Sequence, residues 1–263
     1  MASLAPVEKA VHVCDAADLP WQSAGREGLV LKTVREDRQK GLFLGLVGFE
    51  PVVRSGLHQH TGVATSFVLD GGLTDYFGAI TLHDAGINVK GATHDAIAYQ
   101  KTLLVSRLEA PVIYPADTGR DFALHTGPRF GEIRNPHPEL PPDINVAVDR
   151  LAADPTLVAG VTRKMIFDYA ASAGEHRYAE MAMLPGAKVP AFRTRAPLEL
   201  WIRGGDLRVG GKPAHGNCFV IVEPGATIAL TTDFGALFHA WSDAPVEWLD
   251  APTKAPRPDL FGF

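Results

Sequence analysis

The stretch GLHQHTGVATSFVLDGG, residues 56–72, decides the fold, together with GATH at residues 91–94. His58 and His60 are two residues apart, and on an extended strand that spacing puts both side chains on one face of a sheet. His94 lies 36 residues after His58, a length that fits further strands and turns bringing the chain back beside the first strand. The spacing therefore predicts that His58, His60 and His94 meet as ligands of one metal ion.

Short apolar runs surround this stretch between residues 41 and 115, and Gly and Asp separate them. They are rich in Val, Leu, Ile, Phe and Thr and have no helical period, which predicts a β-sandwich or barrel. Residues 126–143 contain five prolines and no apolar period. We interpret this segment as the start of a connector.

The strand pattern recurs after the connector, because residues 164–205 parallel residues 31–72. Aligning Gly204 and Gly205 with Gly71 and Gly72 places Ala191, Arg193 and Leu198 at the positions of His58, His60 and Thr65. The GAT of residues 225–227 matches that of residues 91–93 and places Ile228 at the position of His94. The second half is therefore expected to keep the scaffold without the metal ligands.

Composition argues against several classes of partner. The net charge is −5 and no basic run occurs, so nucleic acid is not expected. The longest apolar run in the first half, residues 41–49, is too short to span a bilayer. The two cysteines, Cys14 and Cys218, are far apart and the first residues lack a signal-peptide pattern, so we expect a cytoplasmic protein without a disulfide framework.

The motif His-x-His, a strand ending in Gly, and Gly-x-x-His resembles the two motifs of the cupin superfamily. The first of these runs His-x-His, three or four residues, Glu, six residues, Gly; here Thr65 falls at the glutamate and Gly72 closes the motif. With the internal repeat, the resemblance implies an all-β fold of two tandem cupin barrels, which are jelly rolls or double-stranded β-helices. We expect a metal-binding barrel at residues 1–125, a connector at 126–158 and a degenerate barrel without metal ligands at 159–263.

A narrower resemblance covers residues 17–118 and includes HTGVATSFVLDGGLTDYFG and LLVSRLEAPVIYPADTG. These segments are similar to the cupins grouped with acetylacetone dioxygenase, 2,4'-dihydroxyacetophenone dioxygenase and the ChrR-type anti-sigma factors. The resemblance implies either an oxygen-dependent enzyme that cleaves carbon–carbon bonds or a zinc-binding regulatory module. Strand-like sequence begins close to residue 1, so we expect no helical zinc-binding domain ahead of the barrel.

Three neutral imidazoles can hold Fe(II), Zn(II), Ni(II), Cu(II) or Mn(II). Without a carboxylate at Thr65, the ion keeps its full charge toward an anionic, bidentate ligand such as an enolate. We therefore favour an Fe(II) dioxygenase that cleaves a small diketone or hydroxyaryl ketone, and the alternative is a ChrR-like sensing or metal-binding cupin. Thr65, Phe67 and Tyr76 are candidate pocket residues, and no catalytic residue is assigned.

Other features of the site stay open at the level of sequence. Arg54 suits either an anionic substrate at the barrel mouth or a solvated turn. The expected partner is a small molecule, and a homodimer is compatible with the two-barrel layout.

Overall fold

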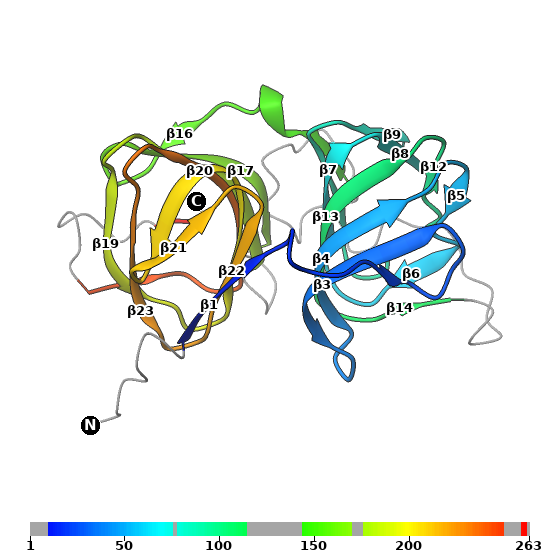
Figure 1. Ribbon diagram of the computed structural model, residues 1–263, viewed down its shortest axis with the longest axis horizontal. Helices are drawn as coiled ribbons and strands as arrows, with labels where there is room; N and C mark the ends of the chain where they lie inside the picture. The colour runs from blue at the N-terminus through cyan, green and yellow to red at the C-terminus, as the bar shows by residue number, and fades with distance from the viewer. Residues whose placement is uncertain (1–9, 76–77, 115–143, 170–175, 250–258, 262–263) are drawn as a thin grey trace. The chain divides into compact units, whose positions relative to one another are not determined.

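The computed structural model describes residues 10–75, 78–114, 144–169, 176–249 and 259–261. These residues divide into two units, each a set of strands that curl around an interior (Figure 1). We call residues 19–114 and 144–150 the first barrel, and residues 10–18 with the described residues from 151 onward the second barrel. Regular structure in the described residues is β apart from one turn of 3-10 helix, so the all-β, two-barrel prediction is confirmed.

The strands of the first barrel form three sheets. They are β2 (Gln22–Ser23), β3 (Leu29–Asp37), β4 (Leu42–Phe49), β5 (Val53–Arg54), β6 (His58–His60), β7 (Ala64–Asp70), β8 (Gly72–Asp75), β9 (Gly78–Thr81), β10 (Asp84–Asn88), β11 (Thr93–His94), β12 (Ile97–Ala98), β13 (Thr102–Leu108), β14 (Val112–Ile113) and β15 (Ile144–Ala147), followed by the 3-10 turn η2 (Val148–Arg150). The orders are β15-β10-β7-β13-β4-β3-β2, β11-β6-β14 and β5-β12-β8-β9.

The second barrel includes the first described strand of the chain. Its strands are β1 (Val11–Asp15), β16 (Asp154–Pro155), β17 (Val161–Tyr169), β18 (His176–Met183), β19 (Lys188–Arg193), β20 (Leu198–Val209), β21 (Lys212–His215), β22 (Cys218–Val222), β23 (Thr227–Thr231), β24 (Ala236–Ser242) and β25 (Glu247–Trp248). They form one sheet with the main order β16-β17-β18-β24-β20-β23-β19-β25, and β1 pairs with β22.

Side-chain alternation along the strands fills both interiors. In the second barrel Leu198, Leu200 and Ile202 of β20 join one buried apolar cluster. In the first barrel a smaller cluster includes Val68 and Leu104. This period of two is what an extended strand with one face in a core requires.

From β6 onward the two barrels repeat with an offset of 134 residues, whereas the turn before β3 and the turn before β17 are related by an offset of 132. In the first barrel His94 lies opposite His58 on the neighbouring strand, and in the second barrel Ile228 lies opposite Phe192 in the same way. The backbone bond from Gly91 N to His60 O recurs from Gly225 N to Thr194 O. Phe192, Thr194 and Ile228 therefore occupy the positions of His58, His60 and His94.

This register corrects the alignment of Ala191, Arg193 and Leu198 with His58, His60 and Thr65, which is one residue out. The positive backbone φ falls on Gly71 (73°) and on Gly205 (83°), so these two glycines correspond. Each barrel has two consecutive glycines at this turn, and the sequence does not reveal which one adopts the left-handed conformation. Ile228 remains opposite His94, as the sequence predicts.

The domain boundaries at residues 125 and 158 stay a prediction, because residues 115–143 lie outside the described part of the chain. Within the described part, β1 pairs in the second barrel and β15 pairs with β10 of the first. No helix in the described part has the length and apolar character that a bilayer crossing requires.

Replacing Gly205 by Ala should destabilise the second barrel by at least about 2 kcal/mol, since a left-handed non-glycine residue costs about 1–2 kcal/mol and steric overlap adds to it. A Cβ at Gly205 would lie 2.0 Å from the Gly235 carbonyl oxygen, whereas a Cβ on the adjacent Gly204 meets no atom within 4 Å. Gly204→Ala is therefore the matched control, with an expected change of less than about 0.5 kcal/mol. Urea unfolding of both variants measures the difference, and equal stabilities would contradict the assigned turn.

Candidate metal centre

The structure brings His58, His60 and His94 together in the first barrel. Their ring centroids are 4.7–5.0 Å apart, and the Nε2 atoms of His60 and His94 are 3.0 Å apart. Each residue is at most 6% exposed. The sequence-predicted convergence of the three imidazoles is therefore present in the fold.

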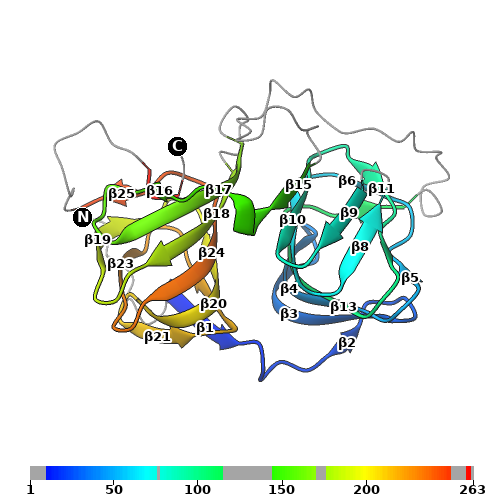
Figure 2. The ribbon, with the colours of Figure 1, turned by 90° about the horizontal axis from the view of Figure 1, so that it is seen from above.

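Strand pairing produces this convergence. β6 and β11 are antiparallel, with His94 directly opposite His58 and Thr93 opposite Gln59, as Figure 2 shows for the two adjacent strands. Gln59 Nε2 donates to Thr93 Oγ1 (3.1 Å) and to the Gly91 carbonyl (3.2 Å). These two hydrogen bonds hold the register that keeps the histidines on one face.

Two acceptors orient the rings. The Nδ1 of His58 lies 2.6 Å from the Gly56 carbonyl oxygen, which can only accept, so this nitrogen carries the proton. The Nδ1 of His94 lies 3.3 Å from a carboxylate oxygen of Asp75, whose side chain is 2% exposed. Both contacts leave the Nε2 lone pair for a ligand, which is the usual arrangement around metal-binding histidines.

Sequence reasoning did not assign Asp75 to the site. It ends β8 (Gly72–Asp75), in a different sheet from the histidines. Its 19-residue separation from His94 carries no motif. The curl of the barrel brings the Asp75 carboxylate next to Nδ1 of His94.

Burial favours the neutral form of His58 and His60. It lowers the pKa of His58 to about 4, and the neighbouring His94 acts in the same direction. Burial also lowers the pKa of His60 well below its usual value, with His58 and His94 adding to the effect. Neutral imidazole is the form that binds metal ions.

The donor set fits a divalent ion. Nitrogens that bind one ion at about 2.0–2.1 Å lie roughly 2.9–3.4 Å apart at ordinary bond angles, and the His60 and His94 Nε2 atoms are 3.0 Å apart. Another group of potential ligand atoms in the described residues, from Asp15, His215 and Cys218, lies in the second barrel away from the Phe192 position. It is less enclosed, since the His215 side chain is 67% exposed.

The three histidines border a cavity of about 370 Å³. Much of its wall is apolar, and the apolar lining includes Leu29, Leu31, Phe43, Val47, Phe49, Leu73, Leu104, Leu108 and Val112. Glu36 is the carboxylate residue among the described residues that line it, and it pairs with Arg38 at 3.1 Å. A small organic molecule fits such a space.

The position expected for a fourth ligand is Ala64 rather than Thr65. Both residues border the cavity. Across the sheet, Thr65 is paired with Ile87 and Arg107, which are not cavity residues, whereas Ala64 is paired with Asn88 and Leu108, which are. Strand alternation therefore directs the Ala64 side chain inward.

The motif spacing agrees with this correction. Three residues separate His60 from Ala64, and six separate Ala64 from Gly71, the glycine with positive φ. The site therefore has a methyl group where the cupin motif has a glutamate.

The other expected pocket residues have different outcomes. Phe67 is fully buried and stacks on His83 with centroids 5.9 Å apart, and it is not among the cavity-lining residues. The physical reason is the same alternation, since Phe67 follows Thr65 by two residues on β7. Tyr76 lies outside the described residues.

Arg54, an open candidate for binding an anion, is engaged in the structure. Its Nε donates to Asp95 at 2.9 Å, and a second guanidinium nitrogen also contacts this carboxylate. The other oxygen of Asp95 accepts the Gly56 backbone N–H at 2.9 Å. Arg54 therefore helps to fix the loop before β6.

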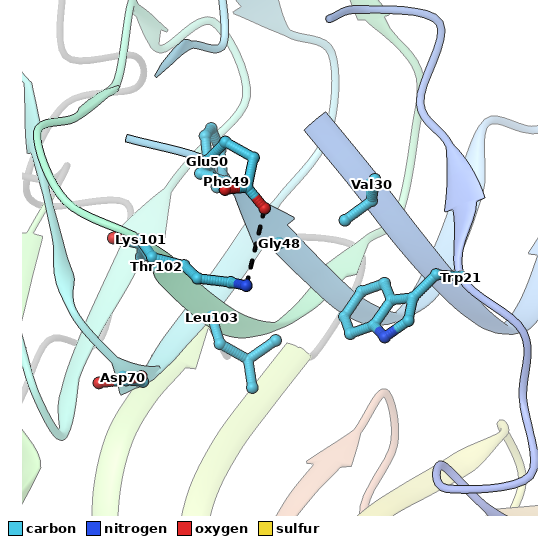
Figure 3. Close-up of a pocket in the computed structure, with 9 residues that line it drawn as sticks. All are labelled: Trp21, Val30, Gly48, Phe49, Glu50, Asp70, Lys101, Thr102 and Leu103. Atoms are coloured by element: carbon cyan, nitrogen blue, oxygen red, sulfur yellow. Dashed lines mark ion pairs between the residues drawn. The ribbon is translucent and has the colours of Figure 1, made fainter. Parts of the chain in front are cut away.

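A separate depression lies over β3, β4 and β13, and its lining residues do not include the three histidines (Figure 3). Glu50 and Lys101 form an ion pair across it at 3.7 Å. Glu50 is therefore engaged outside the histidine cavity, whose lining residues do not include it.

Replacing Asp75 by Asn should weaken Zn(II) binding by about 10-fold or more, because partners that orient a histidine ligand typically contribute 10- to 100-fold. Asp70→Asn is the matched control. Asp70 is an exposed carboxylate at the end of β7, so its replacement should leave the Zn(II) affinity unchanged. Competition with a chromophoric chelator measures both, and circular dichroism checks folding. An unchanged affinity in folded Asp75→Asn protein would remove Asp75 from the site.

Comparison with known proteins agrees with this fold. Residues 9–111 match the family model described as the ChrR cupin-like domain. A search of curated protein sequences gave no match.

Solved structures with a similar fold include three informative cases. A candidate dioxygenase from Nostoc punctiforme PCC 73102 has a TM-score of 0.70 at 14% identity, over 94% of this chain and 88% of that one. Salicylate 1,2-dioxygenase from Pseudaminobacter salicylatoxidans has a TM-score of 0.59 at 14% identity, over 77% and 70%. A variant of Bacillus subtilis oxalate decarboxylase has a TM-score of 0.62 at 12% identity, over 95% and 81%.

At these identities the structural matches establish the fold, and the family model adds a sequence match that covers most of the first barrel. The chain therefore has the two-barrel fold of these solved structures, and its residues 9–111 match the ChrR cupin-like domain.

Proposed function

We propose that the first barrel is a mononuclear metal-dependent dioxygenase, with Fe(II) as the favoured ion, that cleaves a carbon–carbon bond in a small diketone or hydroxyaryl ketone. The observation that carries this proposal is the set of three buried imidazoles facing a largely apolar cavity of about 370 Å³. Two structural neighbours named as a candidate dioxygenase and a salicylate dioxygenase support this class of reaction.

His58, His60 and His94 would hold the ion, and Asp75 would keep the His94 ring in position. A divalent ion bound there supplies Lewis acidity for an enolate and, if it is iron, a site for dioxygen. Ala64 contributes no charge, so an anionic chelating substrate is favoured. The apolar wall, which includes Phe43 and Val47, excludes water from the reacting carbon.

A regulatory role is the second candidate, because the family model that matches residues 9–111 is the ChrR cupin-like domain. In this case the same histidines would hold Zn(II), and the cavity would admit a small ligand without turnover. In both cases we propose a small-molecule ligand and neither a nucleic-acid nor a membrane partner.

The first test is the metal content of protein purified without an affinity tag, together with oxygen uptake in the presence of β-diketones and hydroxyaryl ketones. We expect about one iron per chain and substrate-dependent uptake, because the three histidines are suited to one ion. One zinc per chain, without uptake after iron reconstitution, would favour the regulatory role. A metal-free protein that takes up no added ion would refute both.

The site assignment is tested by His94→Ala, which should lose tight metal binding and oxygen uptake. His83→Asn is the matched control, because His83 lies in the same barrel but pairs with Asp149 at 2.7 Å. Asn suits its positive φ of 63°. Equal metal content in the two variants would contradict the histidine site.

Replacing Ala64 by Glu should restore a carboxylate ligand and strengthen Mn(II) binding by roughly 10-fold, equivalent to about 1.4 kcal/mol. It should weaken the binding of anionic diketonates, since the added negative charge opposes them. Thr65→Glu should give no gain in metal affinity, because its cross-strand partners Ile87 and Arg107 are not cavity residues and strand alternation directs its side chain away from that of Ala64. Calorimetric titration of Mn(II) into the folded variants measures both affinities. A gain only in Thr65→Glu would show that Thr65, and not Ala64, points at the three histidines.

A further inference from the structure

We propose that Arg26 is an anion-binding residue at the edge of the histidine cavity, where it would take the carboxylate of a substrate whose chelating end lies at the three imidazoles. The identity of the chelating end as a β-dione or hydroxyaryl ketone rests on the proposed function. The presence of a carboxylate at the other end is inferred from the surroundings of Arg26.

Arg26 is placed by a fixed turn. It lies between β2 and β3, where Ala24 N donates to Leu29 O and Leu29 N donates to Arg26 O. Gly25 and Gly28 have positive φ values of 78° and 73°. A Cβ at Gly28 would lie 2.4 Å from Val53 Cγ2, so this turn packs closely on the barrel.

The guanidinium group lies beside the site. Its central carbon is 4.4 Å from the ring centroid of Tyr114, a residue that lines the cavity. The Tyr114 ring is in turn 5.7 Å from the His58 ring. Nη1 of Arg26 is also so close to Gly56 that a Cβ there would meet it at 2.4 Å. Gly56 is the residue whose carbonyl holds His58, so Arg26 and the first ligand share a neighbour.

The charges nearby leave Arg26 as the cation suited to an external anion. Arg54 is committed to the buried carboxylate of Asp95, and the cavity-lining Glu36 pairs with Arg38. Among the described residues, no carboxylate pairs with Arg26, which is exposed to solvent and stacked on an aromatic ring. A planar guanidinium held in this way is pre-organised to bind a carboxylate with two hydrogen bonds.

The second barrel provides an internal comparison. The bond from Leu29 N to Arg26 O recurs from Val161 N to Val158 O, so Val158 occupies the position of Arg26. Val158 is 6% exposed and belongs to the apolar cluster. Trp248 occupies the position of Tyr114 and contacts Phe192, which replaces His58. The arginine is therefore present in the barrel that has the imidazoles and is replaced by an apolar residue in the barrel that lacks them.

The substrate class that fits is a β-diketone or hydroxyaryl ketone with a carboxylate separated from the chelating oxygens by a short spacer. A matched pair of probes is 4,6-dioxoheptanoate and heptane-2,4-dione, which have the same carbon chain length and dione but differ in the carboxylate. Zn(II)-loaded protein allows binding to be measured without turnover, by isothermal titration calorimetry.

In the unmodified protein we expect 4,6-dioxoheptanoate to bind at least about 10-fold more tightly than the neutral dione. Arg26→Gln should abolish most of this preference while leaving Zn(II) affinity and binding of the neutral dione unchanged. Lys101→Gln is the comparison variant and should retain the preference, because Lys101 is an exposed cation of the same barrel that pairs with Glu50 away from the three histidines.

The outcomes separate the two proposals. If both probes bind and Arg26→Gln keeps the preference, the role of Arg26 is overturned and the dione function stands. If neither dione binds, the proposed substrate class fails, and hexanoate then tests Arg26 alone. Hexanoate binding that is lost in Arg26→Gln supports the anion site, whereas hexanoate binding that is absent or unaffected by Arg26→Gln overturns it.

Discussion

Because β6 pairs with β11 so that His94 lies opposite His58, the three imidazoles share one face of a small sheet. A slip of one residue would turn His58 and His60 to the other face and bring Gln59 inward. Gln59 prevents this by bonding across to Thr93 and Gly91 on the outer side. Buried imidazoles without partners would cost stability, and the Gly56 carbonyl and Asp75 offset that cost while they direct the ligand nitrogens.

The second barrel shows what the same backbone does without this polar group. Phe192 and Ile228 pair as His58 and His94 do, and both side chains are almost fully buried. Phe192 packs edge-to-face on Trp248 and on Phe261. Aromatic packing thus supplies in the second barrel the stabilisation that hydrogen bonds and a bound ion would supply in the first. The repeat preserves backbone hydrogen bonds, while the side chains inside decide which barrel has a chemical site.

The sequence predicted the fold class and the meeting of the three histidines, because strand spacing and the internal repeat are local patterns. It placed the register of the second barrel one residue out, since two adjacent glycines are equivalent in sequence and only the backbone φ distinguishes Gly71 from Gly72. The same ambiguity assigned the glutamate position of the motif to Thr65 instead of Ala64, although both residues border the cavity. Asp75, Tyr114 and Arg26 reach the site through the curl of the barrel, and no spacing rule links them to the histidines.

The proposed enzymatic and regulatory roles would use the same three histidines as ligands, so these residues do not distinguish the two roles. The two roles differ in what occupies the coordination positions that the three Nε2 atoms leave open. A closed structural site would be filled by a fourth protein ligand, whereas Ala64 leaves this position uncharged and small. The chain carries a net charge of −5, yet the edge of this cavity presents a guanidinium on an aromatic ring. An ion bound by the three histidines and the guanidinium beside the cavity would both attract an anion, and together they would favour a ligand that is negative at both ends.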